Sequence, residues 1–216
     1  MAHAIWPLFN LRGRTLRLAT DDDGVARARL AAAGIHHPEV MPFEIPWTDA
    51  PVTELERNAL QWWWRLRAEC RPDAWALAAA VFLDGEPVGV QDHMARHVSE
   101  LGTVGTGSWL GRAHERRGIG REMRAAVLHL AFEGLGAVAA TSAAFADNPA
   151  SLAVSRALGY TPNGESWTLR RGAPARTVQL RLDRAQWLAR PHPDIVIENL
   201  DGCRAMFGAP APSRSG

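Results

Sequence analysis

The segment Arg116-Arg117-Gly118-Ile119-Gly120-Arg121 combines the residue types that bind a phosphate group through the backbone. Its two glycines allow a tight turn and a close approach of a ligand, and an apolar helical pattern follows directly. The unpaired N–H groups at such a helix start form an anion site, to which the arginines add positive charge. A plain tight turn with solvated arginines fits the same residues, so both interpretations stay open at this point.

Other nucleotide-binding motifs fit this loop less well. A P-loop requires G-x-x-x-x-G-K-[ST], and the sequence has no lysine, because all 24 basic residues are arginine. A dinucleotide fingerprint requires G-x-G-x-x-G, and Met123 occupies its third glycine position. The absence of lysine also excludes a Schiff-base mechanism.

Candidates for proton transfer precede this loop in the chain. Asp92 and His93 are neighbours on a predicted strand, and only one of them faces a given side because successive side chains alternate. His97 and Glu100 lie in the connection to the next strand and are further candidates, as is a water relay.

An irregular succession of predicted strands and helices positions these residues. Strands are expected at 15–19, 75–83, 87–94, 103–110, 137–145 and 178–182. Helices are expected from near Val25 and at 52–71, 120–132, 151–158 and 183–190. Asp84-Gly85-Glu86 between two apolar runs predicts a hairpin. The mixed order indicates an α/β (α+β) fold with helices on both faces of one sheet.

Three successive tryptophans, Trp62, Trp63 and Trp64, fall within the predicted helix 52–71. At about 100° per residue they span about 200° of its surface, so they do not all face one core. The apolar spacing places Trp62 in the buried stripe with Trp63 at its border, and places Trp64 on the exposed side.

The stretch from Gly105 to Tyr160 resembles the GNAT superfamily of N-acyltransferases, and within it the RimJ/RimL-like branch. The donor-binding signature of that family, Q/R-x-x-G-x-G/A, corresponds to Glu115–Gly120, with Glu in the first position. The element N-x-x-S-x-x-V-x-x-x-x-G-F/Y corresponds to Asn148–Tyr160. The segments MPF, PWT, GSWLG and EMRAAVL are similar to those of actinobacterial members, some associated with succinyl-CoA. The resemblance implies a GNAT fold, with a mixed, mostly antiparallel central sheet flanked by helices on both faces.

The resemblance also implies how an acyl-CoA donor is bound. Trp109 and Leu110 pair their backbone with the pantetheine arm, and Asn148 and Ser151 lie near the pantetheine and the thioester. The pyrophosphate is cradled by Arg116, Arg117, Gly118, Ile119, Gly120 and Arg121. For Asn148 the alternative role is capping of the following helix, and for Ser151 it is that of a solvated helix residue.

Many GNAT enzymes use a tyrosine to protonate the leaving thiolate, and the resemblance shows that this chain does not. Its only tyrosine, Tyr160, occupies the G-F/Y position, and the usual tyrosine position holds Ser155. Ser151 is therefore the candidate acid, acting chiefly as a hydrogen-bond donor to developing sulfur charge. Asp92 or His93 is the candidate base.

The expected function is transfer of an acyl group from acetyl-CoA or succinyl-CoA to a primary amine, without a metal. The acceptor is a small-molecule amine or a protein N-terminus. A non-catalytic acyl-CoA-binding protein with the same fold is the alternative. A homodimer or higher homo-oligomer is expected.

The composition argues against several other classes of protein. A net charge of +1 lacks the basic surplus of a nucleic-acid-binding protein. Cys70 and Cys203 have neither disulfide-framework nor zinc-site spacing. No apolar run reaches membrane-spanning length, and the first residues lack a signal-peptide pattern, so a cytoplasmic location is expected. Residues 1–190 are predicted to form the acyltransferase domain, and residues 191–216 a C-terminal extension with a disordered end.

Overall fold

A nine-stranded sheet runs through the described residues, 8–11 and 14–209, of this computed structural model, in the order β7-β8-β6-β5-β4-β3-β2-β1-β9. All neighbouring strands of this sheet are antiparallel except β5 and β6, which are parallel. The predicted mixed, mostly antiparallel sheet is therefore confirmed. The strands are β1 Leu8–Leu11, β2 Arg14–Leu18, β3 Ala74–Leu83, β4 Glu86–Arg96, β5 Thr103–Leu110, β6 Ala139–Phe145, β7 Thr161–Arg170, β8 Ala173–Asp183 and β9 Val196–Glu198.

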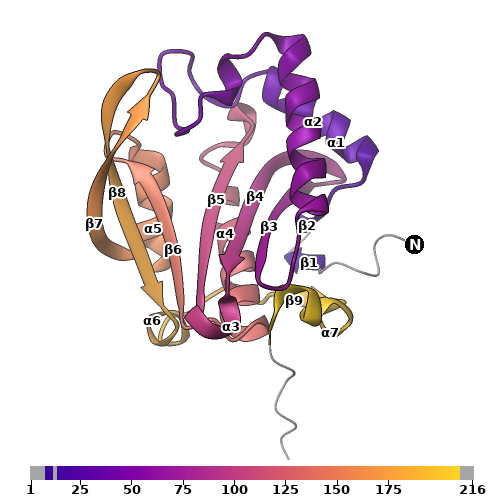
Figure 1. The fold of residues 1–216 in the computed structure, drawn as a ribbon, viewed down its shortest axis with the longest axis vertical. Helices are drawn as coiled ribbons and strands as arrows, with labels where there is room; N and C mark the ends of the chain where they lie inside the picture. Colours follow the sequence, from indigo (N-terminus) through magenta and orange to yellow (C-terminus); the bar gives the residue numbers. More distant parts are fainter. Residues whose placement is uncertain (1–7, 12–13, 210–216) are drawn as a thin grey trace, which may run out of the picture.

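Helices cover both faces of this sheet, as the sequence predicts (Figure 1). Helices α1 and α2 lie over one face, and α4 and α5 lie over the other (Figure 1). The α-helices are α1 Asp21–Ala32, α2 Val52–Ala68, α3 Val98–Leu101, α4 Ile119–His129, α5 Pro149–Leu158, α6 Arg184–Leu188 and α7 Leu200–Cys203. Shorter turns are the 3-10 helices η2 Trp47–Asp49, η3 Arg112–His114 and η5 Arg204–Phe207, and the π-helical turn η4 Leu130–Gly134.

Local sequence accounts for where α1 begins. The backbone N–H of Asp23 donates to the Thr20 hydroxyl (3.2 Å), and the backbone N–H of Thr20 donates to the Asp23 carboxylate (2.7 Å). This reciprocal cap satisfies two backbone donors at the helix start. It begins the helix at Asp21, four residues before the expected start near Val25.

The tryptophan triplet of α2 differs from the expectation at Trp62. Trp63 is 6% exposed, whereas Trp62 is 51% and Trp64 is 47% exposed. Assignment of Trp62 to the buried stripe was therefore wrong. The reason lies in α1, whose buried Arg27 places its guanidinium 3.8 Å from the centre of the Trp63 ring. Trp64 donates its indole N–H to Asp21 at 3.0 Å.

The parallel contact between β5 and β6 is short. It comprises three residue pairs, from Thr103↔Ala139 to Gly105↔Thr141, within the described part of these strands. Beyond Gly105 the two strands diverge, while β5 remains paired with β4 as far as Leu110 (Figure 1). We refer to the space between β5 after Gly105 and β6 after Thr141 as the β5/β6 opening.

The C-terminal segment is part of the main core over its described length. Strand β9 pairs with β1, and the side chains of Ile195, Cys203 and Phe207 are buried in the core. Trp75 of β3 donates its indole N–H to the Phe207 carbonyl at 3.2 Å, and the two rings meet edge to face. Residues 191–209 thus complete the sheet and its core. Of the tail predicted to be disordered, residues 208–216, Gly208 and Ala209 are described and Ala209 packs against the core, whereas residues 210–216 lie outside the described residues.

We predict that Phe207→Ala lowers the free energy of unfolding by about 3–5 kcal/mol, because it leaves a cavity beside Trp75. Urea denaturation monitored by tryptophan fluorescence measures this change. Leu101→Ala is the control, since Leu101 is exposed and its replacement should change the free energy by less than about 0.5 kcal/mol. Equal effects of the two substitutions would contradict a structural role for the C-terminal segment.

Candidate functional site

The glycine loop before α4 has the backbone geometry of an anion site. Gly118 is the N-cap of α4 in the left-handed conformation, with φ of 80°, and Arg116 also has a positive φ of 57°. The first turn closes when the N–H groups of Arg121 and Glu122 donate to the Gly118 carbonyl. The N–H groups of Ile119 and Gly120 precede these bonds and are available to a ligand.

The side chains of the loop divide between solvent and core. Arg116, Arg117 and Arg121 are exposed, as a ligand-facing role requires. The Ile119 side chain is fully buried, so this residue anchors α4 to the core and offers a ligand its backbone alone. A Cβ added at Gly118 would meet no heavy atom nearer than the Glu122 carboxylate, at 4.0 Å, so the space above the loop is open.

Three elements meet where the loop enters α4. A Cβ at Gly120 would lie 3.7 Å from Val154 of α5 and 3.8 Å from Leu110 at the end of β5. The glycine loop therefore lies at the wide end of the β5/β6 opening. Leu110 and Trp109, predicted to present their backbone to the donor, are the last residues of β5 and border this end.

Helix α5 brings the predicted Asn148 and Ser151 to the same region. The Asn148 side chain accepts a hydrogen bond from the Ser151 backbone N–H at 3.1 Å, so Asn148 is the helix N-cap. Ser151 is half-buried. Ser155 is fully buried, and its hydroxyl donates to the Ser151 carbonyl at 3.1 Å.

Strand β4 separates the two candidate bases onto opposite faces. His93 is buried against Trp75, with ring centres 4.9 Å apart, and its ring nitrogens lack partners among the described residues. Burial lowers the pKa of His93 to about 3, so this ring is neutral and belongs to the core. Asp92 lies on the face that carries α1 and α2, across from Gly107 of β5. The further candidates His97 and Glu100 are exposed around α3, at the closed end of β5.

Asp92 has the electrostatic environment of a proton acceptor. Burial raises the pKa of its carboxyl to about 7, and the positive charge of Arg27 opposes this rise. Arg27 is itself buried and donates to the Ala78 carbonyl at 3.1 Å. Burial lowers the pKa of Arg27 to about 9, so its guanidinium remains charged near neutral pH. A carboxyl that titrates near pH 7 is suited to general-base chemistry.

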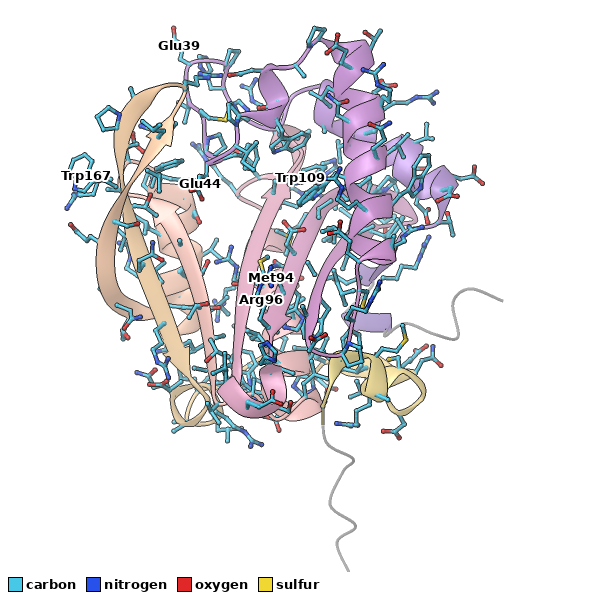
Figure 2. The ribbon with its side chains drawn as sticks, viewed as in Figure 1. Glu39, Glu44, Met94, Arg96, Trp109 and Trp167 are labelled. Carbon is cyan, nitrogen blue, oxygen red and sulfur yellow. The ribbon has the colours of Figure 1, made fainter. Side chains whose placement is uncertain are left out.

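Aromatic rings extend from Trp109 over this face of the sheet. Trp47 lies 6.1 Å from Trp109 and 5.5 Å from Phe43, measured between ring centres. Figure 2 shows Trp109 and Met94 on the sheet, and Glu44 in the loop between α1 and α2 at about the height of Trp109. These rings and the strand face bound a region next to Asp92 that is separate from the glycine loop.

The hairpin of β7 and β8 is joined to the loop between α1 and α2. Arg171 at the hairpin tip donates to the Asp49 carboxylate (2.7 Å from Nε) and to the Pro38 carbonyl (2.9 Å). Figure 1 shows the hairpin tip and this loop next to each other in the upper part of the molecule.

One residue of the region, Arg124 of α4, was missed at the sequence level. Its guanidinium donates to hydroxyls of three elements, Ser108 of β5 (2.9 Å), Ser142 of β6 (3.2 Å) and Ser155 of α5 (3.1 Å). Its side chain is 3% exposed. A signal was available, because Arg124 stands three residues before Val127, on the apolar face of the predicted helix.

Two further properties concern the described residues as a whole. They contain no group of three or more His, Cys, Asp or Glu side chains arranged to hold a metal ion. None of the helices they form is both long and apolar enough to cross a membrane.

Comparison with known proteins identifies the class to which this fold and site belong. The family model of the acetyltransferase (GNAT) domain matches residues 14–161, so the chain belongs to this family.

Solved structures share the fold over most of their length. RimJ from Mycobacterium smegmatis, in complex with CoA-disulfide, is 22% identical, with a TM-score of 0.68 over 85% of this chain and 93% of that one. RimL, a ribosomal L7/L12 alpha-N-protein acetyltransferase in complex with coenzyme A, is 18% identical, with a TM-score of 0.66 over 82% and 97%. A ribosomal-protein-S5-alanine acetyltransferase from Vibrio fischeri is 18% identical, with a TM-score of 0.65 over 85% and 99%. At these identities the likeness shows the fold.

We predict that Asp92 makes the protein less stable as pH rises from about 4 to about 7. In this window the folded state keeps the Asp92 proton while the unfolded chain, with a carboxyl pKa near 3.9, has lost it. Asp92→Asn cannot titrate, so it should gain stability relative to the wild type across this window and hold that gain above pH 7. Urea denaturation of both proteins at several pH values measures the difference. A difference that stays constant with pH would contradict the raised pKa.

Proposed function

We propose that the protein transfers an acetyl group from acetyl-CoA to the N-terminal amine of a protein. The observation that carries this proposal is the open glycine loop at the start of α4, located at the wide end of the β5/β6 opening. Membership of the acetyltransferase (GNAT) domain family supports the reaction class. The fold likeness to RimL, which is described as an alpha-N-protein acetyltransferase, supports an N-terminal acceptor over a free small-molecule amine.

The donor is assigned to the α4 and α5 face. The N–H groups of the loop would hold the pyrophosphate, with the loop arginines contributing charge. The backbone of Trp109 and Leu110 borders the opening where the pantetheine arm would lie. Asn148 and Ser151 at the start of α5 would lie beside the thioester, and Ser151 is assigned to help the thiolate depart. Ser155 would serve this site from its buried position, through its bond to Arg124.

The acceptor is assigned to the opposite face, next to Asp92. An amine must lose its proton to attack, and a carboxylate with a pKa of about 7 accepts it near neutral pH. The exposed Glu44 adds negative charge beside this region, which favours an ammonium group (Figure 2). His93 is left out of this proposal because it lies on the other face of β4.

Succinyl-CoA is kept as the alternative donor. A succinyl group carries a carboxylate that requires a cation near the acyl site. Arg96 is exposed at the end of β4, on the same face as Asp92 and Met94, and is the candidate for such a cation (Figure 2). Parallel assays with acetyl-CoA and succinyl-CoA distinguish the two donors.

We predict that the protein releases CoA thiol from acetyl-CoA in the presence of a peptide with a free N-terminus. The value of kcat/KM should rise with pH through about 7, as Asp92 loses its proton. Asp92→Asn should lower kcat/KM by about 10²–10⁴-fold and abolish this rise. The matched control is the same peptide with an acetylated N-terminus and an internal lysine, which should give little turnover. Donor binding without turnover for any amine would instead support a non-catalytic acyl-CoA-binding protein.

We also predict that Gly118→Ala weakens acetyl-CoA binding by at least about tenfold, because the added methyl group stands where the phosphate approaches the backbone. Isothermal titration calorimetry measures the affinity. Gly136→Ala is the matched control, since Gly136 also has a positive φ (72°) and open space around it, but lies beyond the other end of α4. Both variants carry similar backbone strain, so equal losses of affinity would contradict the phosphate assignment.

A further inference from the structure

Arg124 is a buried cation without a carboxylate partner among the described residues. Its charged hydrogen bonds go to three neutral hydroxyls, and its Nε has no partner in the described part of the chain. Burial lowers its pKa, and the titratable group that faces it from the surrounding elements is Tyr160. Burying an unneutralised charge is costly, and a neutral side chain would serve equally well as packing between α4 and the sheet. Such a charge is explained by an anion that the site receives.

The location of the Arg124 guanidinium indicates where the site would receive this anion. Gly105↔Thr141 is the last pair that closes the β5/β6 opening, and Leu110 borders its wide end beside the glycine loop. Ser108 lies between these limits on β5, and Ser142 lies just past the last pair on β6. Because Arg124 binds both serines, its charge spans the opening between the closed end and the phosphate loop.

The hydroxyl protons of the cluster are not equally available. Ser142 donates to the Thr106 carbonyl at 3.2 Å, and Ser155 donates to the Ser151 carbonyl at 3.1 Å. Ser108 accepts from Arg124, and its own proton has no partner in the described part of the chain. Ser108 is also half-buried, whereas Ser155 is fully buried. A hydroxyl that accepts a bond from a cation becomes a stronger donor, so Ser108 is the polarised donor of the cluster.

We propose that Ser108, polarised by Arg124, donates a hydrogen bond to the sulfur of the departing CoA, and that Arg124 is the positioning residue behind it. This inference rests on the proposed function. In the transfer, the amine nitrogen bonds to the carbonyl carbon and the carbon–sulfur bond breaks, with its electron pair going to sulfur. Asp92 takes the proton from the amine, and the thiolate later receives a proton through Ser151 or solvent. The fixed positive charge of the Arg124 guanidinium stabilises the thiolate, and Arg124 does not transfer a proton to it.

This arrangement accounts for the chemistry of a chain with one tyrosine. The Tyr160 hydroxyl is buried and hydrogen-bonded to the Thr106 hydroxyl at 3.2 Å. Burial raises the pKa of Tyr160, so it stays neutral in the pH range in which a thiol ionises. Stabilising the thiolate electrostatically removes the need for a strong acid at the moment the bond breaks.

The experiment compares CoA with desulfo-CoA, which lacks the sulfur, by calorimetry between pH 7 and 9. The wild type should prefer CoA increasingly as pH rises, because the bound thiol ionises below the pH at which the free thiol does. Arg124→Met should raise the pKa of the bound thiol and so flatten this preference. The affinity for CoA at pH 9 should fall by about tenfold for each unit by which that pKa rises. Desulfo-CoA affinity should not change. Turnover should fall by roughly 10–100-fold with KM for acetyl-CoA nearly constant.

Two variants separate an electrostatic role from a structural one. Arg124→Lys keeps the charge and should restore most of the pH-dependent preference for CoA. Ser108→Ala leaves Arg124 in place and should lose much of the preference, so the test holds even if Arg124→Met does not fold. Retention of the preference in Ser108→Ala, or in a folded Arg124→Met, overturns the inference. A wild type that binds neither ligand overturns the proposed function instead.

Discussion

The divergence of β5 from β6 is the constraint on which the rest of the site depends. After Gly105 the two strands no longer satisfy each other's backbone groups, and buried polar groups must find other partners. At the narrow end Ser142 donates to the Thr106 carbonyl, and Arg124 links both strands through their serines. At the wide end the strand edge stays free, and the glycine loop opens beside it. A ligand with a phosphate at one end and hydrogen-bonding groups along its length fits this arrangement.

Strand alternation then divides the chemistry between two faces of one sheet. Asp92 points toward α1 and α2, while Ser108 and Thr106 point toward α4. Each face carries one buried arginine, Arg27 beside Asp92 and Arg124 beside the serines. On the first face the cation limits how far burial raises the carboxyl pKa, which leaves Asp92 titrating near neutrality. On the second face no carboxylate of the described chain neutralises the cation, so its charge is available to a ligand.

How much the sequence revealed depended on whether a feature leaves a local pattern. The hairpin at Gly85 and the Asn148 cap have such patterns, and the structure contains both. Strand β7, residues 161–170, was missed because it is an edge strand in which only Trp167 and Leu169 alternate with polar residues, and both of these side chains are exposed. The burial of Trp63 in place of Trp62 depends on Arg27 from another helix. The position of Arg124 on the apolar face of its helix was a local signal of burial, but its three serine partners come from other elements and leave no local pattern.

The bridge between the β7–β8 hairpin and the loop after α1 bears on how an acceptor reaches Asp92. The ion pair of Arg171 with Asp49 is exposed on both sides, so by itself it contributes little to stability. The ring contacts of Phe43 with Trp47 and of Trp47 with Trp109 hold the loop more firmly, because they bury apolar surface. The contact at the hairpin is therefore the weaker of the two. For the peptide acceptor proposed above, approach from the hairpin side would therefore disturb less of the structure next to Asp92.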